Sequence, residues 1–199
     1  MTARFVVEHL SATHSRTGFR SCVEPLDRYF HTQVTQDVRR RATSCYVAVD
    51  AATARIAGYY TLSAAHVALH DLPEAMAKRL PRYPTVPVAR LGRLAVDGEY
   101  RGQKLGAALL WDAAARAARS EMAVFALLVD AKDDQAEAFY RHPGFVPFGS
   151  ATRQLVLPVA TFAADVRRSV ASARACRKPF HNAIRDKAPV RESSPMDVR

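Results

Sequence analysis

The sequence has few cysteines and no long hydrophobic run, and both absences narrow what the protein can be. Its three cysteines, Cys22, Cys45 and Cys176, are odd in number and far apart. That pattern fits neither a disulfide framework nor a zinc site built from Cys-x-x-Cys pairs, so reduced thiols are expected. The longest apolar stretches fall far short of the roughly 20 residues that a transmembrane helix needs. Arg4 and Glu8 interrupt the first ten residues, which therefore do not resemble a secretory signal, and we expect a cytoplasmic protein.

Several catalytic motifs are also missing. The chain has no Gly-x-Ser-x-Gly nucleophile elbow, no Walker phosphate loop and no catalytic Cys/His signature. His66 and His70 are four residues apart, but the glutamate of a His-Glu-x-x-His motif is absent and nothing marks a third ligand. We therefore expect no metal site.

Positive charge is what the sequence has in excess. Lys and Arg number 29 against 19 Asp and Glu, which gives a formal charge of +10 and a pI near 10.0. Such a surface attracts polyanions, so nucleic acid and phosphorylated cofactors are both candidate ligands. The 199 residues suffice for one well-buried domain, which we assign to residues 1–160. Residues 161–199 are predicted to form a basic helix, from Thr161 to about Ala175, and then a mobile tail broken by prolines.

Hydrophobic periodicity predicts a mixed α/β domain. An uninterrupted apolar run at 123–129 is typical of a strand buried on both faces. It follows a strand at 88–96 and an alanine-rich helix at 105–119, an order that implies a parallel strand pair. Further strands are predicted at 5–7, 45–49, 56–62, 145–148 and 154–157, and further helices at 26–41, 73–80 and 133–141.

The segment from Arg101 to Ala107 links that strand to that helix. Glycines at 102 and 106 permit unusual backbone angles and close approach, while Arg101 and Lys104 supply positive charge. Backbone amides at the start of a helix can hold a phosphate. Taken alone, the segment could equally be a tight turn with a solvated Arg and Lys.

The surrounding residues give this loop its context. Arg93-Leu94-Ala95-Val96-Asp97 before it, and Ala138-Phe139-Tyr140 with Gly144-Phe145 after it, resemble the GNAT acetyltransferase superfamily. The resemblance implies an α/β GNAT fold, a mixed central sheet with splayed parallel strands four and five flanked by helices. It also implies acetyl-CoA as acetyl donor. The residues that it assigns to cofactor binding are Leu94, Ala95, Val96, Arg101, Gly102, Gln103, Lys104, Leu105, Gly106 and Ala107.

Two catalytic roles follow from the same resemblance. The backbone N–H of Val96 would lie near the thioester carbonyl and stabilise its developing negative charge. Tyr140 would act as general acid for the departing thiolate, since a tyrosine remains protonated at pH 7. Its alternative role is an aromatic anchor beside Phe139. Many family members have glycine where this chain has Lys104. We expect direct transfer without an acetyl-enzyme intermediate.

A second resemblance concerns the acceptor. Phe19, Cys22, Leu26-Asp27 and Tyr29-Phe30 are similar to the start of one GNAT branch, the toxins of toxin–antitoxin pairs. That branch implies acetylation of the α-amino group of aminoacyl-tRNA, a block of translation, a ribbon-helix-helix antitoxin and a homodimer. Candidate tRNA contacts are Arg39, Arg40, Arg41, Arg79, Arg82 and Arg90, although each could be merely solvated. Two alternatives stay open: an acetyltransferase for a protein or small-molecule amine, and a cofactor-binding module without catalysis.

Overall fold

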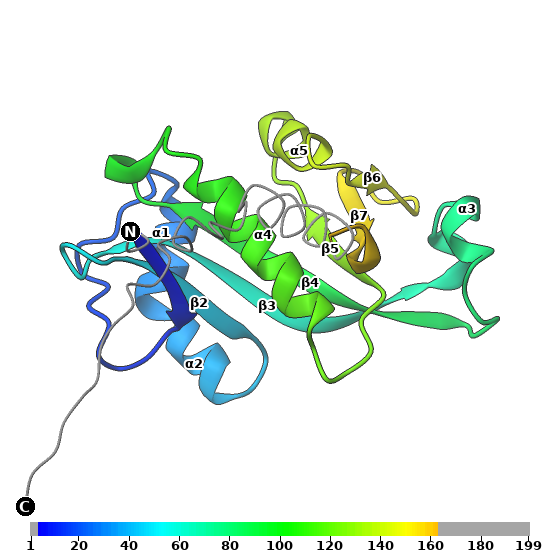
Figure 1. Ribbon diagram of the computed structural model, residues 1–199, viewed down its shortest axis with the longest axis horizontal. Helices are drawn as coiled ribbons and strands as arrows, with labels where there is room; N and C mark the ends of the chain where they lie inside the picture. The colour runs from blue at the N-terminus through cyan, green and yellow to red at the C-terminus, as the bar shows by residue number, and fades with distance from the viewer. Residues whose placement is uncertain (1–3, 163–199) are drawn as a thin grey trace, which may run out of the picture.

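The computed structural model describes residues 4–162, and they form one seven-stranded sheet in the order β1-β2-β3-β4-β5-β7-β6 (Figure 1). Within this part β4 and β5 are parallel and all other neighbours are antiparallel. The mixed α/β prediction is therefore confirmed. The strands are β1 (Phe5–His9), β2 (Ser44–Asp50), β3 (Ile56–Ala68), β4 (Thr85–Val96), β5 (Ala126–Asp130), β6 (Val146–Pro147) and β7 (Gln154–Pro158).

The strands β3 and β4 are longer than predicted and pair over almost their whole length. Their register runs from Gly58↔Val96 to Ala68↔Thr85, so β3 continues past the predicted end at residue 62 and β4 begins before the predicted start at residue 88. Pro84 and Pro87 hid this extension, because proline fixes φ and lacks a backbone donor. The paired strands carry a short helix, α3 (Glu74–Ala77), and a 3₁₀ turn, η1 (Leu69–Asp71), away from the main body of the sheet (Figure 1).

One predicted helix is in fact two. The periodicity predicted a single helix over 26–41, but the structure has α1 (Glu24–Thr32) and α2 (Val34–Arg39). Gln33 separates them with φ −113° and ψ −35°, outside ideal helical values. Phe30 and Val34, one on each side of the break, are both fully buried, each with 0% exposure. The prediction was wrong because the apolar spacing continues across Gln33 and does not reveal a break at a single residue.

The helices cover both faces of the sheet, and two adjacent tyrosines show how. Side chains alternate between faces along a strand, so Tyr59 and Tyr60 of β3 point in opposite directions. Tyr60 donates a hydrogen bond to Asp112 of α4 (Leu105–Ala118) at 2.5 Å. Tyr59 donates to the Leu26 carbonyl of α1 at 2.9 Å and stacks on Phe30, with ring centroids 4.2 Å apart. The α4 face and the α1 face are named below from these contacts.

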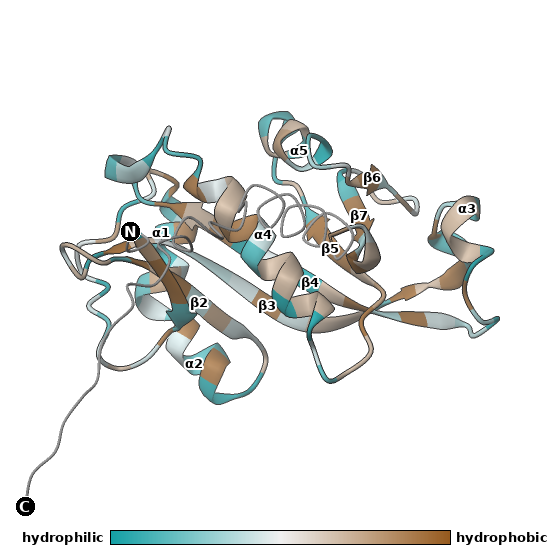
Figure 2. Ribbon diagram, viewed as in Figure 1, coloured by the Kyte–Doolittle hydropathy of each residue, from teal (hydrophilic) through white to brown (hydrophobic). Residues whose placement is uncertain are grey.

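Three apolar clusters make up the core. One lies under α4, one under α1 and α2, and one between the outer ends of β3 and β4 and the strands β5 and β7. Figure 2 shows hydrophobic residues concentrated along the strands. The remaining helix, α5 (Asp134–Arg141), packs beside β5, and a short 3₁₀ turn, η2 (Gly98–Tyr100), follows β4. Residues 159–162 are helical, whereas the rest of the predicted helix up to Ala175 lies outside the described residues.

No helix in the described part of the chain is long and apolar enough to cross a membrane.

Gly58 tests how tightly α4 is packed on the sheet. A Cβ added there would lie 2.8 Å from Leu109 Cδ1 and 3.0 Å from the Ala95 carbonyl oxygen. Because this overpacks the sheet–helix contact, we expect Gly58→Ala to lower the free energy of unfolding by about 1–3 kcal/mol in urea denaturation. Gly18→Ala is the matched control, since its Cβ would meet nothing within 4 Å. Equal stability of both variants would contradict this packing.

Candidate active site

The candidate site begins where β4 separates from β5. Their register starts at Val88↔Ala126 and ends at Leu91↔Val129, although β4 continues to Val96. The predicted splay of the fourth and fifth strands is confirmed. Gly92 is an extra residue at this point, because Leu91 pairs with Leu62 while Arg93 pairs with the adjacent Thr61. A bulge of this kind bends a strand and ends its regular pairing.

Beyond the bulge, one edge of β4 has no strand partner among residues 4–162. The Asp97 N–H donates to the Ala57 carbonyl on β3 at 2.9 Å. Hydrogen bonds alternate in direction along an antiparallel strand, so the backbone groups of Leu94 and Val96 point away from β3 and toward the opening. Those of Ala95 point to β3. The geometry therefore favours Leu94 and Val96 over Ala95 as backbone partners for a ligand.

The predicted phosphate loop lies at the same opening. Residues 101–104 are exposed, Gly102 has φ +73° and Lys104 has φ +59°, and α4 then starts at the buried Leu105. No side chain caps the first amides of α4, so these donors are available to an anion. Gly106 faces both Val96 and Phe139, because a Cβ built on it would lie 3.7 Å and 3.8 Å from their side chains. The first turn of α4 and the free edge of β4 thus lie side by side.

Two of the three long polar side chains in this loop already have partners. The Arg101 guanidinium donates to the Ser21 carbonyl, and Gln103 Oε1 accepts from Arg4 at 2.7 Å. Lys104 makes neither a hydrogen bond nor an ion pair within residues 4–162. Its left-handed backbone explains why glycine is common at this position. In this chain a lysine holds that conformation and adds an uncommitted positive charge.

Tyr140, on α5, packs against the same core cluster as Leu94 and Val96. Its ring packs beside Phe139 and Phe145, with centroid distances of 5.1 Å and 5.7 Å. Burial raises the pKa of Tyr140 to about 12. Its hydroxyl has no hydrogen-bond partner among the described residues. The ring thus packs as an aromatic anchor, and the hydroxyl is still able to donate a hydrogen bond to a ligand.

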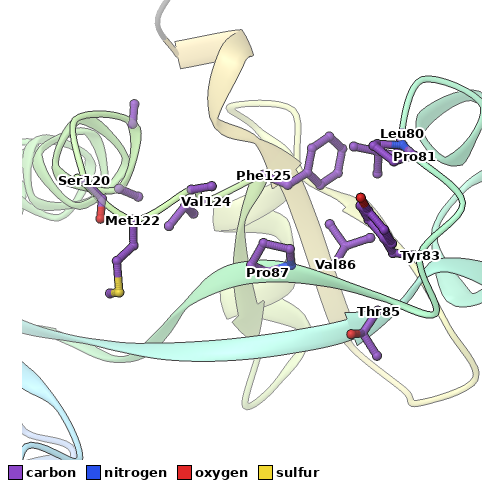
Figure 3. Close-up of a pocket in the computed structure, with 13 residues that line it drawn as sticks. Leu80, Pro81, Tyr83, Thr85, Val86, Pro87, Ser120, Met122, Val124 and Phe125 are labelled. Carbon is purple, nitrogen blue, oxygen red and sulfur yellow. The ribbon is translucent and has the colours of Figure 1, made fainter.

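An apolar slot of about 280 Å³ adjoins the loop between α4 and α5, lined by Ala107, Leu110, Trp111, Phe139, His142 and Pro143. A second hollow, of about 540 Å³, lies at the opposite end of α4. Figure 3 shows Tyr83 and Leu80 on one side of it and Met122 on the other, with Phe125 between. This second hollow lacks charged side chains and is separate from the opening between β4 and β5.

Comparison with known proteins identifies the family to which this fold belongs. The model of the acetyltransferase (GNAT) family matches residues 7–145. The chain belongs to this family.

Three individual similarities refine the comparison. A tRNA-acetylating toxin of Mycobacterium tuberculosis (strain ATCC 25618 / H37Rv) is 35% identical over 131 residues, which are 65% of this chain and 76% of that protein. A structure of AtaT complexed with acetyl-methionyl-tRNAfMet has a TM-score of 0.75 at 26% identity, covering 81% of this chain and 99% of the AtaT chain. A tyrosine-to-phenylalanine mutant of KacT has a TM-score of 0.74 at 25% identity, with coverage of 81% and 99%.

The six arginines named from the sequence do not gather at one place in this GNAT fold. Arg39, Arg40 and Arg41 are exposed at the end of α2. Arg79 and Arg82 are exposed near α3, on the extension of β3 and β4 far from α2 (Figure 1). Only Arg90 lies beside the opening, where its Nε is 3.4 Å from Asp130 Oδ2. That pair lacks hydrogen-bond geometry, since the same Nε is buried without a hydrogen-bond partner among the described residues.

Sequence reasoning missed Arg93 as a side chain that could bind substrate. Its guanidinium carbon lies 3.4 Å from the ring centroid of Tyr29, whose hydroxyl donates to Asp37 at 3.0 Å. Burial, aided by the bond to Asp37, raises the pKa of Tyr29 to about 12. Arg93 has no carboxylate partner within residues 4–162 and lies on the α1 face of the opening. Nothing in the sequence singles out Arg93, because only the structure shows which arginines form ion pairs and which do not.

Among residues 4–162 there is no group of three side chains that could hold a metal ion.

The backbone at Lys104 gives a prediction about stability. A non-glycine residue in the left-handed region costs about 1–2 kcal/mol, whereas glycine costs about 0.5–1 kcal/mol through unfolded-state entropy. We expect Lys104→Gly to be more stable than Lys104→Ala by about 1 kcal/mol in urea denaturation. Both variants lose the charge, so the comparison isolates the backbone. Identical midpoints and slopes would show that Lys104 is not held in this conformation.

Proposed function

We propose that this GNAT protein transfers the acetyl group of acetyl-CoA to the α-amino group of aminoacyl-tRNA, and so blocks translation as a toxin. The observation that carries the proposal is the opening between β4 and β5. It combines a free β4 edge at Leu94 and Val96 with the uncapped amides of α4. The name of the mycobacterial relative and the tRNA complex of AtaT support the choice of acceptor.

Binding of the donor follows from these groups. The α4 amides and Lys104 would hold the pyrophosphate, since a helix N-terminus and a nearby cation both favour anions. The outward backbone groups of Leu94 and Val96 would pair with the amides of the pantetheine arm, as an added strand does. The Val96 N–H would then donate to the thioester oxygen as it becomes negative. A fixed backbone donor stabilises that charge without reorganisation.

The proton balance assigns a role to Tyr140. The amine nitrogen bonds to the thioester carbon, the carbon–sulfur bond breaks, and one nitrogen proton ends on sulfur. Tyr140, with a pKa of about 12, cannot readily give its proton to a thiolate whose acid has a pKa near 8.5. Full transfer would be uphill by roughly 5 kcal/mol. We therefore propose that the hydroxyl donates a hydrogen bond to sulfur and passes a proton only as it regains one from the ammonium.

The acceptor would approach from the α1 face, opposite α4. The donor occupies the α4 side, so an amine that attacks the same carbon must come from elsewhere. On that face Arg93 and Arg90 lie beside the opening, and the formal charge of +10 favours a polyanionic substrate. An α-amino group next to an ester has a lower pKa than a lysine side chain, so a useful neutral fraction exists at pH 7. A dedicated general base is then unnecessary.

The remaining expectations belong to this proposal. A toxin that acts on aminoacyl-tRNA would work in the cytoplasm, and its cell would need an antitoxin. We propose a small ribbon-helix-helix protein as that partner and a homodimer as the working form. Residues 161–199 would be a basic extension beyond the catalytic domain. Co-purification with the neighbouring gene product and light scattering would test the partner and the dimer.

The decisive assay incubates the purified protein with charged tRNA and labelled acetyl-CoA. We expect label on the aminoacyl group, and we expect Tyr140→Phe to lower kcat by about 10²–10³-fold, because the donor to sulfur is lost. The KM for acetyl-CoA should stay nearly constant. Wild-type kcat should not fall between pH 8 and pH 10 on account of this tyrosine, since its hydroxyl is protonated throughout that range.

Phe145→Leu is the matched control, because it disturbs the aromatic packing around Tyr140 but leaves the hydroxyl. A similar loss in both variants would assign Tyr140 a packing role. Label found only on protein or on a small amine would reject the tRNA acceptor while leaving acetyl transfer intact. Tight CoA binding with no transfer to any acceptor would reject catalysis.

Arg93 provides a test of the acceptor face. We expect Arg93→Gln to raise the KM for charged tRNA about 10-fold and to flatten its salt dependence, because one phosphate contact is removed. The KM for acetyl-CoA should not change. Arg119→Gln is the control, as Arg119 is exposed at the C-terminal end of α4, away from the opening. An equal effect of both substitutions would mean that general charge, not this position, recruits the tRNA.

A further inference from the structure

The segment Arg20–Cys22 lies against the start of the connection between β4 and α4. The Arg20 N–H donates to Asp97 Oδ2 at 2.8 Å, and the Gly98 N–H donates back to the Arg20 carbonyl at 2.9 Å. Asp97 is buried, with 2% exposure, and its other oxygen caps η2 by accepting from the Glu99 N–H at 3.0 Å. Residues far apart in sequence are thus joined just before the phosphate loop.

Asp27, in the first turn of α1, holds this segment from the other side. Its Oδ1 accepts from the Ser21 N–H at 2.8 Å and from the Ser21 hydroxyl at 2.5 Å. Ser21 is 2% exposed. Bonds between a buried residue and a carboxylate are charge-assisted and stronger than neutral ones. The position of Ser21 is therefore set by α1.

Ser21 in turn is bonded to the phosphate loop. Its carbonyl accepts from the Arg101 guanidinium, and Cys22 follows in the left-handed region with φ +61°, which turns the chain toward α1. Asp27, Ser21 and Arg101 thus form a continuous chain of hydrogen bonds. This chain connects a helix of the α1 face to the loop that opens α4.

The loop has few other restraints. Residues 101–104 are exposed, two of them have positive φ, and the one other side-chain tie to a distant element among the described residues joins Gln103 to Arg4. A loop that must present backbone amides to an anion loses affinity when it is allowed to fluctuate, because binding then has to restore its order. Preorganisation of this loop consequently depends on how Arg101 is held.

We propose that Asp27 is a positioning residue for the cofactor, and that it orders the phosphate loop through Ser21 and Arg101. This rests on the proposed use of acetyl-CoA. The proposal gives a physical role to Asp27, one of the residues between Phe19 and Phe30 on which the resemblance to the toxin branch rests. Asp27 bonds to Ser21 and not to the phosphate loop itself, so it would act on cofactor affinity indirectly, from the α1 face.

The test measures the affinity for CoA by isothermal titration calorimetry on the full chain. Asp27→Ala should raise the Kd about 10-fold, since the order of the loop is lost. Asp27→Asn retains an oxygen that can accept both Ser21 bonds, and it should stay within about 3-fold of wild type. Glu24→Ala is the control, because Glu24 lies on the same helix in an exposed pair with Arg28 at 3.5 Å.

A double-mutant cycle separates positioning from a direct role of Arg101. If Asp27 acts through Arg101, Asp27→Ala should have no further effect on the Kd in an Arg101→Ala background. Unchanged Kd in Asp27→Ala, or additive effects in the double variant, would overturn the proposal. At saturating acetyl-CoA, kcat should be retained, which a general loss of folding would not allow.

Ser21→Ala is a second variant that tests the same proposal if Asp27→Ala does not fold. It removes the hydroxyl bond but keeps the amide bond, and it should raise the Kd about 3-fold; no change there would overturn the proposal. Failure of the wild-type protein to bind CoA would instead reject the proposed function, so the two failures are distinguishable.

Discussion

The divergence of β4 from β5 at Gly92 is the constraint on which the rest of the site depends. An extra residue at this point reverses which side chains face α4: Leu91 precedes the bulge on the α4 face, and Leu94 follows it on the same face. In an uninterrupted strand, odd-numbered residues would continue on that face and Arg93 would be buried under α4. The bulge instead directs Arg93 to the α1 face and frees the backbone edge of Leu94 and Val96. One inserted residue thus creates both the donor edge and the acceptor-side cation.

The two helices that flank this opening are fixed to the sheet by different chemistry. On the α4 face, Tyr60 bonds to Asp112, which also pairs with Arg116 at 2.7 Å, and burial together with the Asp112 bond raises the pKa of Tyr60. On the α1 face, Tyr59 is held mainly by aromatic packing with Phe19 and Phe30. A splayed sheet loses strand–strand hydrogen bonds at its opening, so side-chain contacts such as these must hold the geometry.

The sequence alone predicted those features that depend on residues close together in the chain. Strand, glycine-containing loop and alanine-rich helix follow directly in the chain, so the loop at Arg101–Ala107 and its position before α4 could be predicted. The break at Gln33, the length of β3 and β4, and the bulge could not, because each depends on what packs or pairs from elsewhere. The engagement of Arg101 with Ser21 is similar: 80 residues separate the partners, and nothing local marks the contact. Charge alone could not separate Arg93 from the six arginines named from the sequence.

The distribution of uncommitted charge gives a further reason to assign the two faces to two ligands. Arg90 and Arg101 both lie near the opening, but Arg90 forms an ion pair with Asp130 and Arg101 donates to the Ser21 carbonyl. Lys104 and Arg93 have no such partner within residues 4–162, and they lie on opposite faces. Arg93 is half-buried and contacts the Tyr29 ring but no carboxylate, so a phosphate would stabilise its charge further, whereas Lys104 is exposed and solvated. Two phosphate-bearing molecules that meet from opposite sides would each find one of these cations, whereas a small amine acceptor would bring no anion to Arg93. Electrostatics therefore favours a nucleic-acid acceptor over a small-molecule one.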